Sequence, residues 1–415
     1  MRKSNPKNTF GVNHAKFSIA DELLDFQRLV IGAHSVEAKQ RKSIKIEITV
    51  TEFEKFQKHS DEIQTFFEWI TDREIKFEFL KIGKTGKQQR LSESSYDFVS
   101  LFSGGLDSSS YPLLQDNLNQ RGLLHHTITS LRMQGVARRV HKKCMPYNHK
   151  MVETDLGLTG AADIPLLHVR GVVFLTNLMC MASEYEINRV VIPENGPFMI
   201  NYPVSMRVTP TRTTDPSMIT EWTRIFQNIS GKKIKIETPF FNHTKSEIIL
   251  MSNKPELIKH TWSCSTSQGI AKMCGLCMAC FVRILSLHTI KQGENLDNIY
   301  EDNAMDLSEN NLKMRKKDSF RTLINCVEFW KYLIHPDLAP THVEQEDCVN
   351  LVKRHKVMKN HALEMYIGLK NYLEINNGRS ALASLVESNL EVIDDNMLEK
   401  RYSQLERQIN NYGTV

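Results

Sequence analysis

Residues 99–110 read VSLFSGGLDSSS, an apolar run followed by two glycines, an acid and a row of hydroxyls. The stretch SYDFVSLF, residues 95–102, has the β-branched and aromatic content of a buried strand, and Asp107 or Ser108 would cap a helix continuing through Leu114. Gly104 and Gly105 carry no Cβ, so their backbone N–H groups can converge at the start of that helix. The order of residues predicts an anion site suited to phosphate.

The side chains of this segment extend the prediction to a nucleotide with magnesium. The lysine of the common triphosphate loop, G-x-x-x-x-G-K-[ST], is missing. Ser103 and Ser108 can offer hydroxyls instead, and Asp107 can hold Mg²⁺ between phosphate oxygens. The plain alternative is a glycine-rich turn followed by a helix cap.

A second group of reactive side chains is the run of cysteines in TWSCSTSQGIAKMCGLCMACFVR. Cys264, Cys274, Cys277 and Cys280 are half of the eight cysteines in the chain, and the last three are spaced C-x₂-C-x₂-C. Four thiolates can surround a tetrahedral Zn²⁺ at about 2.3 Å, and such a closed site is structural. The alternatives are an iron–sulfur cluster, or four buried cysteines without metal.

The elements that position these residues alternate between strand and helix. Strand patterns occur in SYDFVSLF, GLLHHTITSL and INRVVIP, with a basic helix near ARRVHKK and a long helix over residues 172–185. The alternation predicts a doubly wound α/β domain, in which ligands bind at the carboxyl ends of parallel strands. VVIPENG would bring Glu194 and Asn195 to that edge, where they could bind nucleobase edges, although PENG is also a plain turn sequence.

Composition sets broad limits on the class of protein. The chain has 415 residues, of which 41% are hydrophobic and 24% charged, and a formal charge of +5 with both signs mixed. These values fit a soluble protein of two or three domains, and nucleic acid is not indicated as a partner. The apolar stretch LLHVRGVVFLTNLMCMA contains His168 and Arg170 and is too short to span a bilayer, so we expect a cytoplasmic protein.

The segments outside the central part have a different character. Residues 1–95 mix strand and helix patterns and predict an N-terminal α+β extension. Residues 96–290 hold the glycine loop and the cysteines, and residues 291–415 read as a linker followed by amphipathic helices. We expect three domains with these boundaries.

The string SGGLDS resembles the PP-loop of the N-type ATP pyrophosphatases, which cleave ATP to AMP and pyrophosphate while adenylating a substrate oxygen. The PP-loop followed by W-S-C and C-G-x-C-x-x-C resembles the 7-cyano-7-deazaguanine synthase (QueC) family over residues 95–290. The resemblance implies ATP, Mg²⁺ and structural Zn²⁺ as cofactors, the four cysteines as zinc ligands, and adenylation of 7-carboxy-7-deazaguanine before attack by ammonia.

Site residues follow from the same resemblance. RGVVFLTNLMCMASE and TPFFNHTKSEII look like family segments that carry over to Arg170, Lys245 and Glu247. Asp107, Ser108 and Lys245 are then the catalytic candidates. The nucleotide-binding candidates are Ser103, Gly104, Gly105, Leu106, Asp107, Ser108 and Arg170, with Glu194 and Asn195 as substrate-binding candidates.

The chain also departs from the family pattern. Gly171 stands where the family has Asn, the family's Y-G-Q-R-H is replaced by TSLRMQGVARRVH, and the substrate loop is replaced over residues 193–218. The two extensions resemble those of QueC-like members of bacterial anti-phage systems, such as the QatC component of the Qat system. Ammonia and an amino group of a partner protein therefore both remain open as the acyl acceptor.

Two other classes of function also fit the motifs. A PP-loop enzyme that thiolates RNA would use its cysteines for catalysis or for a cluster, and a non-catalytic subunit would keep the loop merely to bind ATP. Intact SGGLDS favours an enzyme, and the fourth cysteine at position 264 favours a closed zinc site.

Overall fold

A computed structural model describes residues 9–12, 15–17, 21–37, 43–83, 95–128, 130–155, 168–200, 213–254, 256–264, 272–293, 299–302, 314–339, 342–375 and 383–412. These residues form two compact units. The first, here the sheet unit, holds the described residues up to Glu194 together with 198–200 and 213–239. The second, the helical unit, holds residues 195–197 and the described residues from Phe240 onward.

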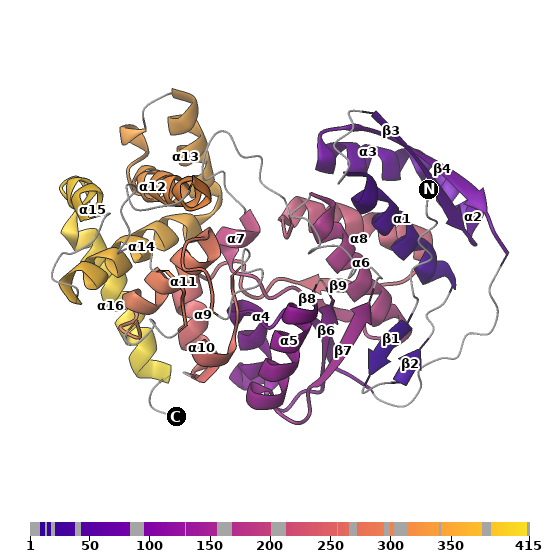
Figure 1. Cartoon of the computed structure of the whole chain (residues 1–415), viewed down its shortest axis with the longest axis horizontal. Coiled ribbons are helices and arrows are strands. Elements are labelled where there is room, and N and C mark those ends of the chain that lie inside the picture. Colours follow the sequence, from indigo (N-terminus) through magenta and orange to yellow (C-terminus); the bar gives the residue numbers. More distant parts are fainter. Residues whose placement is uncertain are drawn as a thin grey trace. The chain divides into compact units, whose positions relative to one another are not determined.

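The sheet unit is built on a seven-stranded sheet in the order β2-β1-β7-β6-β5-β8-β9 (Figure 1). Its strands are β1 Thr9–Val12, β2 Ala15–Phe17, β5 Phe98–Leu101, β6 Gly122–Thr127, β7 Lys150–Asp155, β8 Arg189–Val191 and β9 Lys235–Glu237. The five strands from β7 to β9 pair in parallel, while β1 pairs antiparallel with both β7 and β2. The predicted α/β fold with a parallel sheet is therefore confirmed.

The strand order places a topological switch point between β5 and β8. From β5 the chain proceeds outward to β6 and β7, then returns to β8 on the other side of β5. Ligands of doubly wound sheets bind beyond the carboxyl ends of the strands at such a point. Here the loop that follows β5 is the glycine loop, and the loop that follows β8 contains Glu194.

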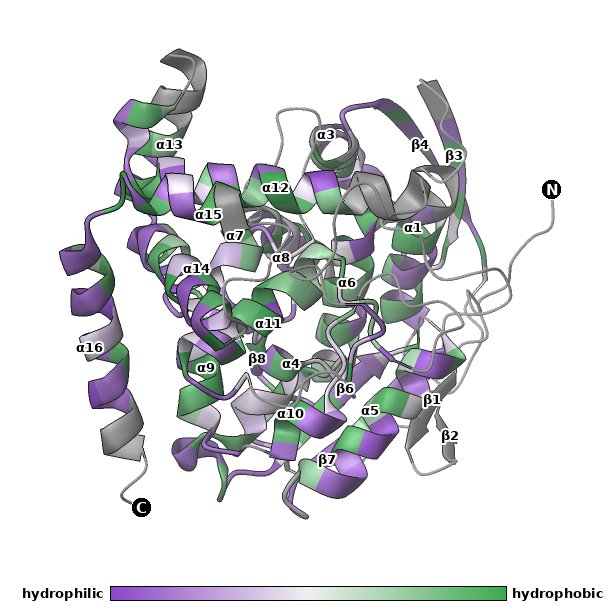
Figure 2. Ribbon diagram, turned by 60° about the vertical axis from the view of Figure 1, so that its left-hand side comes forward, coloured by the Kyte–Doolittle hydropathy of each residue, from purple (hydrophilic) through white to green (hydrophobic). Residues whose placement is uncertain are grey.

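The helices of the sheet unit accompany these strands. They are α1 Asp21–Glu37, α2 Phe53–Lys58, α3 Ser60–Thr71, α4 Leu106–Ser110, α5 Leu131–Cys144, α6 Val169–Glu184 and α8 Pro216–Ser230, and the short α7 runs Gly196–Ile200. Helix α6 is apolar on nearly every side (Figure 2), because it packs between the sheet and α1. Helix α8 begins at Pro216, whose missing N–H costs nothing in a first turn, after Asp215 as N-cap.

The helix after the glycine loop is shorter than predicted, and its cap is different. Helix α4 ends at Ser110 and continues as a 3₁₀ turn over Tyr111–Leu113, with Gly105 and not Asp107 or Ser108 as N-cap. Pro112 has no N–H to donate to the fourth carbonyl back, so the α-helical hydrogen bonds stop there. Leu114 is already extended.

The N-terminal strands β3 Ser43–Val50 and β4 Glu74–Lys81 form a separate two-stranded parallel sheet. Helices α1, α2 and α3 cover it, and aromatic side chains join it to α8 in one core. Phe26 lies 4.4 Å from Phe226 between ring centroids, and Phe66 stacks on Trp222 at 5.0 Å. The N-terminal region therefore completes the core of the sheet unit, while the predicted boundary at residue 95 stays a prediction.

The helical unit confirms the prediction of a helical C-terminal region. Its helices are α9 Lys245–Ser252, α10 Glu256–His260, α11 Met278–Thr289, α12 Met314–Ile334, α13 His342–Arg354, α14 Lys356–Ile375, α15 Ala383–Leu390 and α16 Asp395–Tyr412, with a 3₁₀ turn at Pro336–Leu338. Helices α11 and α14 approach closely, since a Cβ on Gly368 would lie 2.4 Å from the Leu285 carbonyl oxygen. None of the described helices is long and apolar enough to cross a membrane.

Candidate functional site

The glycine loop, residues 103–108, leaves β5 and turns sharply at Gly104, whose φ is +77°. A Cβ at this position would also lie 3.0 Å from the backbone of Ala137 in α5. Both facts favour glycine, because the left-handed region strains other residues and a contact of 3.0 Å leaves little room for a side chain. The loop is therefore held against α5 with its backbone fixed.

The hydroxyls of the loop bind one another and its backbone. The Oγ atoms of Ser103 and Ser108 are 3.0 Å apart, the Ser103 N–H donates to Ser108 Oγ, and the Gly105 N–H donates to Ser103 Oγ. Ser103 is exposed, whereas Leu106, Asp107 and Ser108 are buried. The hydroxyl and N–H donors predicted from the sequence thus lie together in one turn. A bound anion could accept hydrogen bonds from these groups in place of the bonds that they make with one another.

Arg170 lies at the same edge of the sheet as the glycine loop. Helix α6 leads into β8 and so runs opposite to the strands, which places its first turn beside their carboxyl ends. The guanidinium carbon of Arg170 stacks 5.2 Å from the ring centre of Phe174, one turn further along α6. Glu194, half-buried after β8, is at this edge too.

The structure gives a reason for Gly171. A Cβ there would lie 2.0 Å from the carbonyl oxygen of Thr213 and 2.6 Å from its Cα. The chain just before α8 therefore crosses directly over the first turn of α6. Thr213 belongs to the stretch that departs from the family pattern, of which residues 201–212 lie outside the described part of the chain.

In the helical unit, Asn195 and Gly196 lie against the turn that precedes Lys245. The Gly196 N–H donates to the carbonyls of Phe240 and His243, and a Cβ on Gly196 would lie 1.9 Å from the Phe241 carbonyl oxygen. Asn195 is buried at 1% exposure. PENG is thus a junction that admits only glycine at its last position.

Lys245 is the first residue of α9 and is buried at 6% exposure. Thr244 caps the helix, and Glu247 accepts from the Thr244 N–H in a capping box. Glu247 also forms an ion pair of 2.6 Å with Arg401 of α16. Glu247 therefore holds the turn that presents Lys245, and nothing in the local sequence indicates its partner 154 residues away.

The four cysteine sulfurs of the helical unit converge. Their Sγ atoms all lie within 4.8 Å of one another, with 3.9 Å between Cys274 and Cys280 and 4.0 Å between Cys264 and Cys277. A tetrahedral Zn²⁺ at about 2.3 Å from each sulfur implies separations of about 3.8 Å. These two separations match that value and the others do not exceed 4.8 Å, so the cluster fits a zinc ion after small adjustments.

The backbone around this cysteine cluster is shaped for thiolates. N–H groups of Leu276 and Cys277 donate to Cys274 Sγ, and that of Cys274 donates to Cys264 Sγ. Gly275 has φ +73°, and a Cβ on it would lie 1.6 Å from the Asp302 carbonyl oxygen. The strand-like bridge between Met273 and Tyr300 closes the turn.

Electrostatics in the cluster favour a bound cation. Contact with Cys274 lowers the pKa of Cys264, whereas contact with Cys264 raises the pKa of Cys277 and of Cys280. Packed thiols therefore cannot all ionise at neutral pH without a positive ion among them. Fully buried Arg283 ties Ser263, beside Cys264, to α11.

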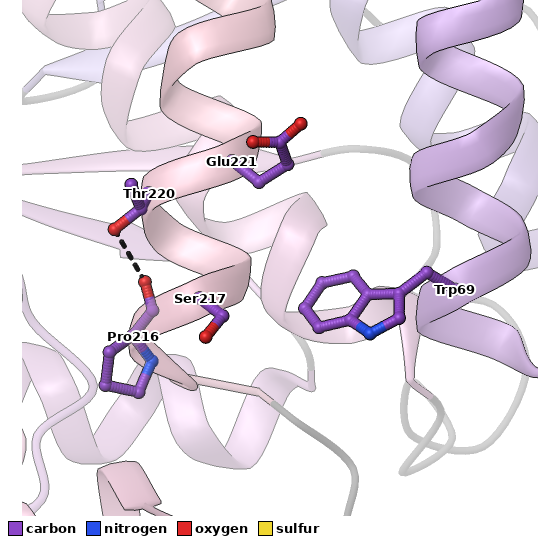
Figure 3. A pocket seen from close by; sticks show the side chains of 5 residues that line it. All are labelled: Trp69, Pro216, Ser217, Thr220 and Glu221. Carbon is purple, nitrogen blue, oxygen red and sulfur yellow. Dashed lines mark hydrogen bonds between the residues drawn. The ribbon is translucent and has the colours of Figure 1, made fainter.

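A shallow pocket lies elsewhere in the sheet unit, between α3 and the first turns of α8 (Figure 3). Trp69 lines one side and Pro216, Ser217, Thr220 and Glu221 the other. None of the residues predicted for the site lines this pocket. Glu221 is paired with Arg224 at 2.5 Å, and Arg224 also forms an ion pair with Glu62.

Comparison with known proteins agrees with this geometry. The family model described as "Queuosine biosynthesis protein QueC" matches residues 148–291, which include Arg170, Lys245 and the four cysteines and begin after the glycine loop. The chain is 27% identical over 217 residues to a 7-cyano-7-deazaguanine synthase of Nostoc punctiforme, covering 45% of this chain and 92% of that protein. Synthases of Rickettsia canadensis and Rickettsia akari are each 25% identical, over 214 and 220 residues, with the same coverage. The chain is therefore QueC-like, with a helical C-terminal region beyond the matched part.

Proposed function

We propose that this protein is an ATP-dependent carbon–nitrogen ligase that adenylates a carboxylate and releases pyrophosphate. The observation that carries the proposal is the glycine loop, with its fixed φ at Gly104 and its cluster of exchangeable donors at the switch point of a parallel sheet. Such a site suits the phosphates of a nucleotide. The QueC-like sequence supports ATP as that nucleotide.

Activation by ATP explains what the residues would contribute. A carboxylate and an amine do not condense in water, whereas an acyl adenylate presents AMP as a leaving group. The loop N–H groups and the Ser103 and Ser108 hydroxyls would hold the departing pyrophosphate, and Asp107 would ligate Mg²⁺, which neutralises phosphate charge. Arg170 and Lys245 would supply further positive charge to the phosphates.

The proposed acyl substrate is 7-carboxy-7-deazaguanine. Support comes from the relatives, which are 7-cyano-7-deazaguanine synthases. Glu194 at the sheet edge and buried Asn195 have the donors and acceptors that a purine-like ring edge requires. Zinc at the cysteine cluster would be structural, since four sulfur ligands leave no open position.

The proposed acceptor is an amino group of a partner protein, with free ammonia as the alternative. The replaced stretch over residues 193–218 supports it, because Thr213 of that stretch crosses α6 at Gly171, and both positions depart in sequence from the family pattern. A polypeptide end needs a channel and a docking surface, whereas ammonia needs only a small closed pocket. A role in an anti-phage system, as a QatC-like component, would fit such an acceptor.

The test is incubation of the protein with ATP, Mg²⁺ and 7-carboxy-7-deazaguanine, with ammonium in one arm and co-purified partner proteins in the other. Mass spectrometry should find deazaguanine amide or nitrile in the first arm, or a partner that gains the mass of an amide-linked deazaguanine in the second. Absence of both products would reject the ligase. An unmodified partner beside efficient nitrile formation would reject the protein acceptor alone.

A visible spectrum and metal analysis separate this proposal from an RNA-thiolating enzyme. The sulfur separations of 3.9 and 4.0 Å favour one zinc ion per chain and a colourless protein. Iron with visible absorption would favour the thiolating enzyme instead.

A further inference from the structure

Around the first turn of α9, the helical unit buries a group of charged side chains that the proposed chemistry does not yet use. Arg401 of α16 lies between Glu247 of α9 and Glu364 of α14, at 5%, 6% and 0% exposure. Its Nη2 donates to both carboxylates, and its Nε donates to Glu364 at 3.0 Å. One guanidinium therefore bridges two helices from a third.

The bridge leads directly to Lys245. Glu247 closes the capping box of α9, so its position fixes the Thr244 backbone and the turn on which Lys245 stands. On the other side, His361 lies one turn before Glu364 on α14, and burial, with a smaller contribution from the charge of Lys245, lowers the pKa of His361 to about 3. Lys245 thus has a neutral imidazole near it and a fixed carboxylate two residues further along α9.

Helix α14 is itself anchored firmly to the part of the chain that matches the QueC family. Thr289 Oγ1 of α11 donates to the Glu364 carbonyl at 2.6 Å, and the Asn371 amide donates to the His288 carbonyl at 3.0 Å. With Gly368 pressed against Leu285, α14 has little freedom to move. Glu364, which Arg401 contacts on this side, therefore belongs to a firmly held helix, and from it Arg401 reaches Glu247 in the first turn of α9.

We propose that Arg401, a residue of the C-terminal helical region, is a positioning residue for Lys245, holding the first turn of α9 through Glu247 against the fixed Glu364. The proposal rests on the proposed function, in which Lys245 stabilises phosphate charge during adenylation. The C-terminal region is then part of the catalytic scaffold and not merely an addition to it.

The alternative is that Arg401 only stabilises packing between the helices. Variants that remove Arg401 with or without one of its carboxylate partners distinguish this role from positioning. Removing Arg401 alone leaves two buried carboxylates without a cation, which destabilises any fold. Removing Arg401 and Glu364 together, as Arg401→Met with Glu364→Gln, leaves Glu247 in its capping box and relieves most of that cost. A purely structural role predicts that this double variant recovers both stability and rate, whereas positioning predicts that it recovers stability alone.

The mildest variant is Arg401→Lys, because an ammonium keeps the charge but cannot bridge two carboxylates with a planar fork. We expect kcat for AMP formation from ATP and 7-carboxy-7-deazaguanine, measured with the acyl acceptor present, to fall about tenfold to a hundredfold, as for a displaced catalytic group, with the KM for ATP nearly unchanged. The acid limb of the pH–rate profile should move to higher pH. The reason is that the lysine ammonium stabilises the ionised carboxylates of Glu247 and Glu364 less than the bridging guanidinium does, so their pKa values rise. The titratable and charged groups around the carboxylates of Glu247 and Glu364 come from three elements. They are His243 and Lys245 from α9 and the turn before it, His361 from α14, and Arg401 from α16.

Two controls complete the experiment. Arg407→Lys changes an exposed arginine on the same helix and should leave rate and pH profile as in the wild type. Lys245→Met should lose activity at least as severely as Arg401→Lys. A Lys245→Met variant with full activity would overturn the role of Lys245 and this proposal with it, while glycine-loop variants would still test adenylation.

The proposal alone is overturned if Lys245→Met is inactive but Arg401→Lys keeps the wild-type kcat and pH profile. It is equally overturned if the double variant regains the wild-type rate. A stable double variant that remains slow, with Arg407→Lys unaffected, is the result that we expect.

Discussion

The glycine loop and the cysteine cluster share one backbone conformation, a turn at a glycine with positive φ, but carry different side chains around it. Each turns at a glycine with positive φ, Gly104 at +77° and Gly275 at +73°, and each presses that glycine against a neighbouring backbone, Ala137 or Asp302. In both, backbone N–H groups point at side-chain atoms of the same turn. The local conformation therefore does not decide what a site does.

The side chains next to each glycine make the difference. Serine hydroxyls both donate and accept, so Ser103 and Ser108 can bind each other and still exchange that bond for a phosphate oxygen. Thiolates only accept, and four of them gathered within 4.8 Å need a cation that stays. Under the proposed function the glycine loop binds and releases a nucleotide while the cysteine cluster keeps its metal, so substitutions should separate activity from stability.

The largest expected effect is loss of activity in Asp107→Ala. If Asp107 ligates magnesium on the phosphates, ATP cleavage should fall by about 10³-fold or more. The midpoint of thermal unfolding should change little, because the loop backbone is set by Gly104 and not by this carboxylate. The measurement is AMP release beside a thermal melt, and a stable Asp107→Ala protein with normal turnover would contradict the role of Asp107.

Cys277→Ser should show the reverse pattern. Loss of one thiolate opens the zinc site, so bound zinc should fall from one per chain towards none and stability by about 3 kcal/mol or more. Cys144→Ser, at a half-buried cysteine of α5 outside the cluster, is the control and should keep the bound zinc and the stability of the wild type. Metal analysis and melting curves test this, and a metal-free wild-type protein of equal stability would end the zinc assignment.

The pH dependence of stability in the helical unit is the next effect in size. Burial raises the pKa of Glu364 from its ordinary 4.5 to about 7, against the opposing charge of Arg401. The folded state then holds a proton that the unfolded state releases above pH 4.5, so this group's contribution to stability declines as pH rises from 4.5 to about 7.

Glu364→Gln cannot titrate and should lack that decline, which amounts to about 3 kcal/mol. Melting midpoints between pH 4.5 and 7.5 measure the difference from the wild type. Parallel curves for the two proteins would show that Glu364 is ionised throughout.

The smallest expected effect is the difference in stability between alanine substitutions of two glycines, Gly104 in the glycine loop and Gly135 in α5. Gly104→Ala should cost about 1–2 kcal/mol, because φ +77° strains alanine and its Cβ meets Ala137. Gly135→Ala is the matched control, since a Cβ on Gly135 of α5 meets nothing within 4 Å and should stabilise the helix by about 0.5–1 kcal/mol. Equal effects of the two changes on stability and on the KM for ATP would contradict the geometry of the loop.

Sequence was sufficient where function depends on local spacing. The SGGLDS loop after a strand and the C-x₂-C-x₂-C run each fix their geometry within a few residues, so the turn from strand to helix at the glycines and the converging sulfurs could be predicted. The end of α4 was predicted wrongly, because helical spacing was given more weight than Pro112. Pro112 was the available signal.

Sequence was insufficient where partners are distant. Leu398 and Leu405 have helical spacing, but Arg401 between them reads as a solvent-exposed position, and nothing local indicates that Glu247 and Glu364 surround it. Gly196 and Gly171 pose the same difficulty, because their need for glycine comes from Phe241 and Thr213. Only the fold reveals these contacts.

The most direct test of the central claim is identification of the nucleotide products when the protein is given ATP, Mg²⁺, 7-carboxy-7-deazaguanine and an acceptor that frees AMP from the acyl adenylate, ammonium in one arm and co-purified partner proteins in the other. Anion-exchange chromatography should find AMP and pyrophosphate in equal amounts, dependent on the acid and absent with Asp107→Ala. Formation of ADP and orthophosphate would contradict the assignment of the glycine loop as a pyrophosphate-releasing site.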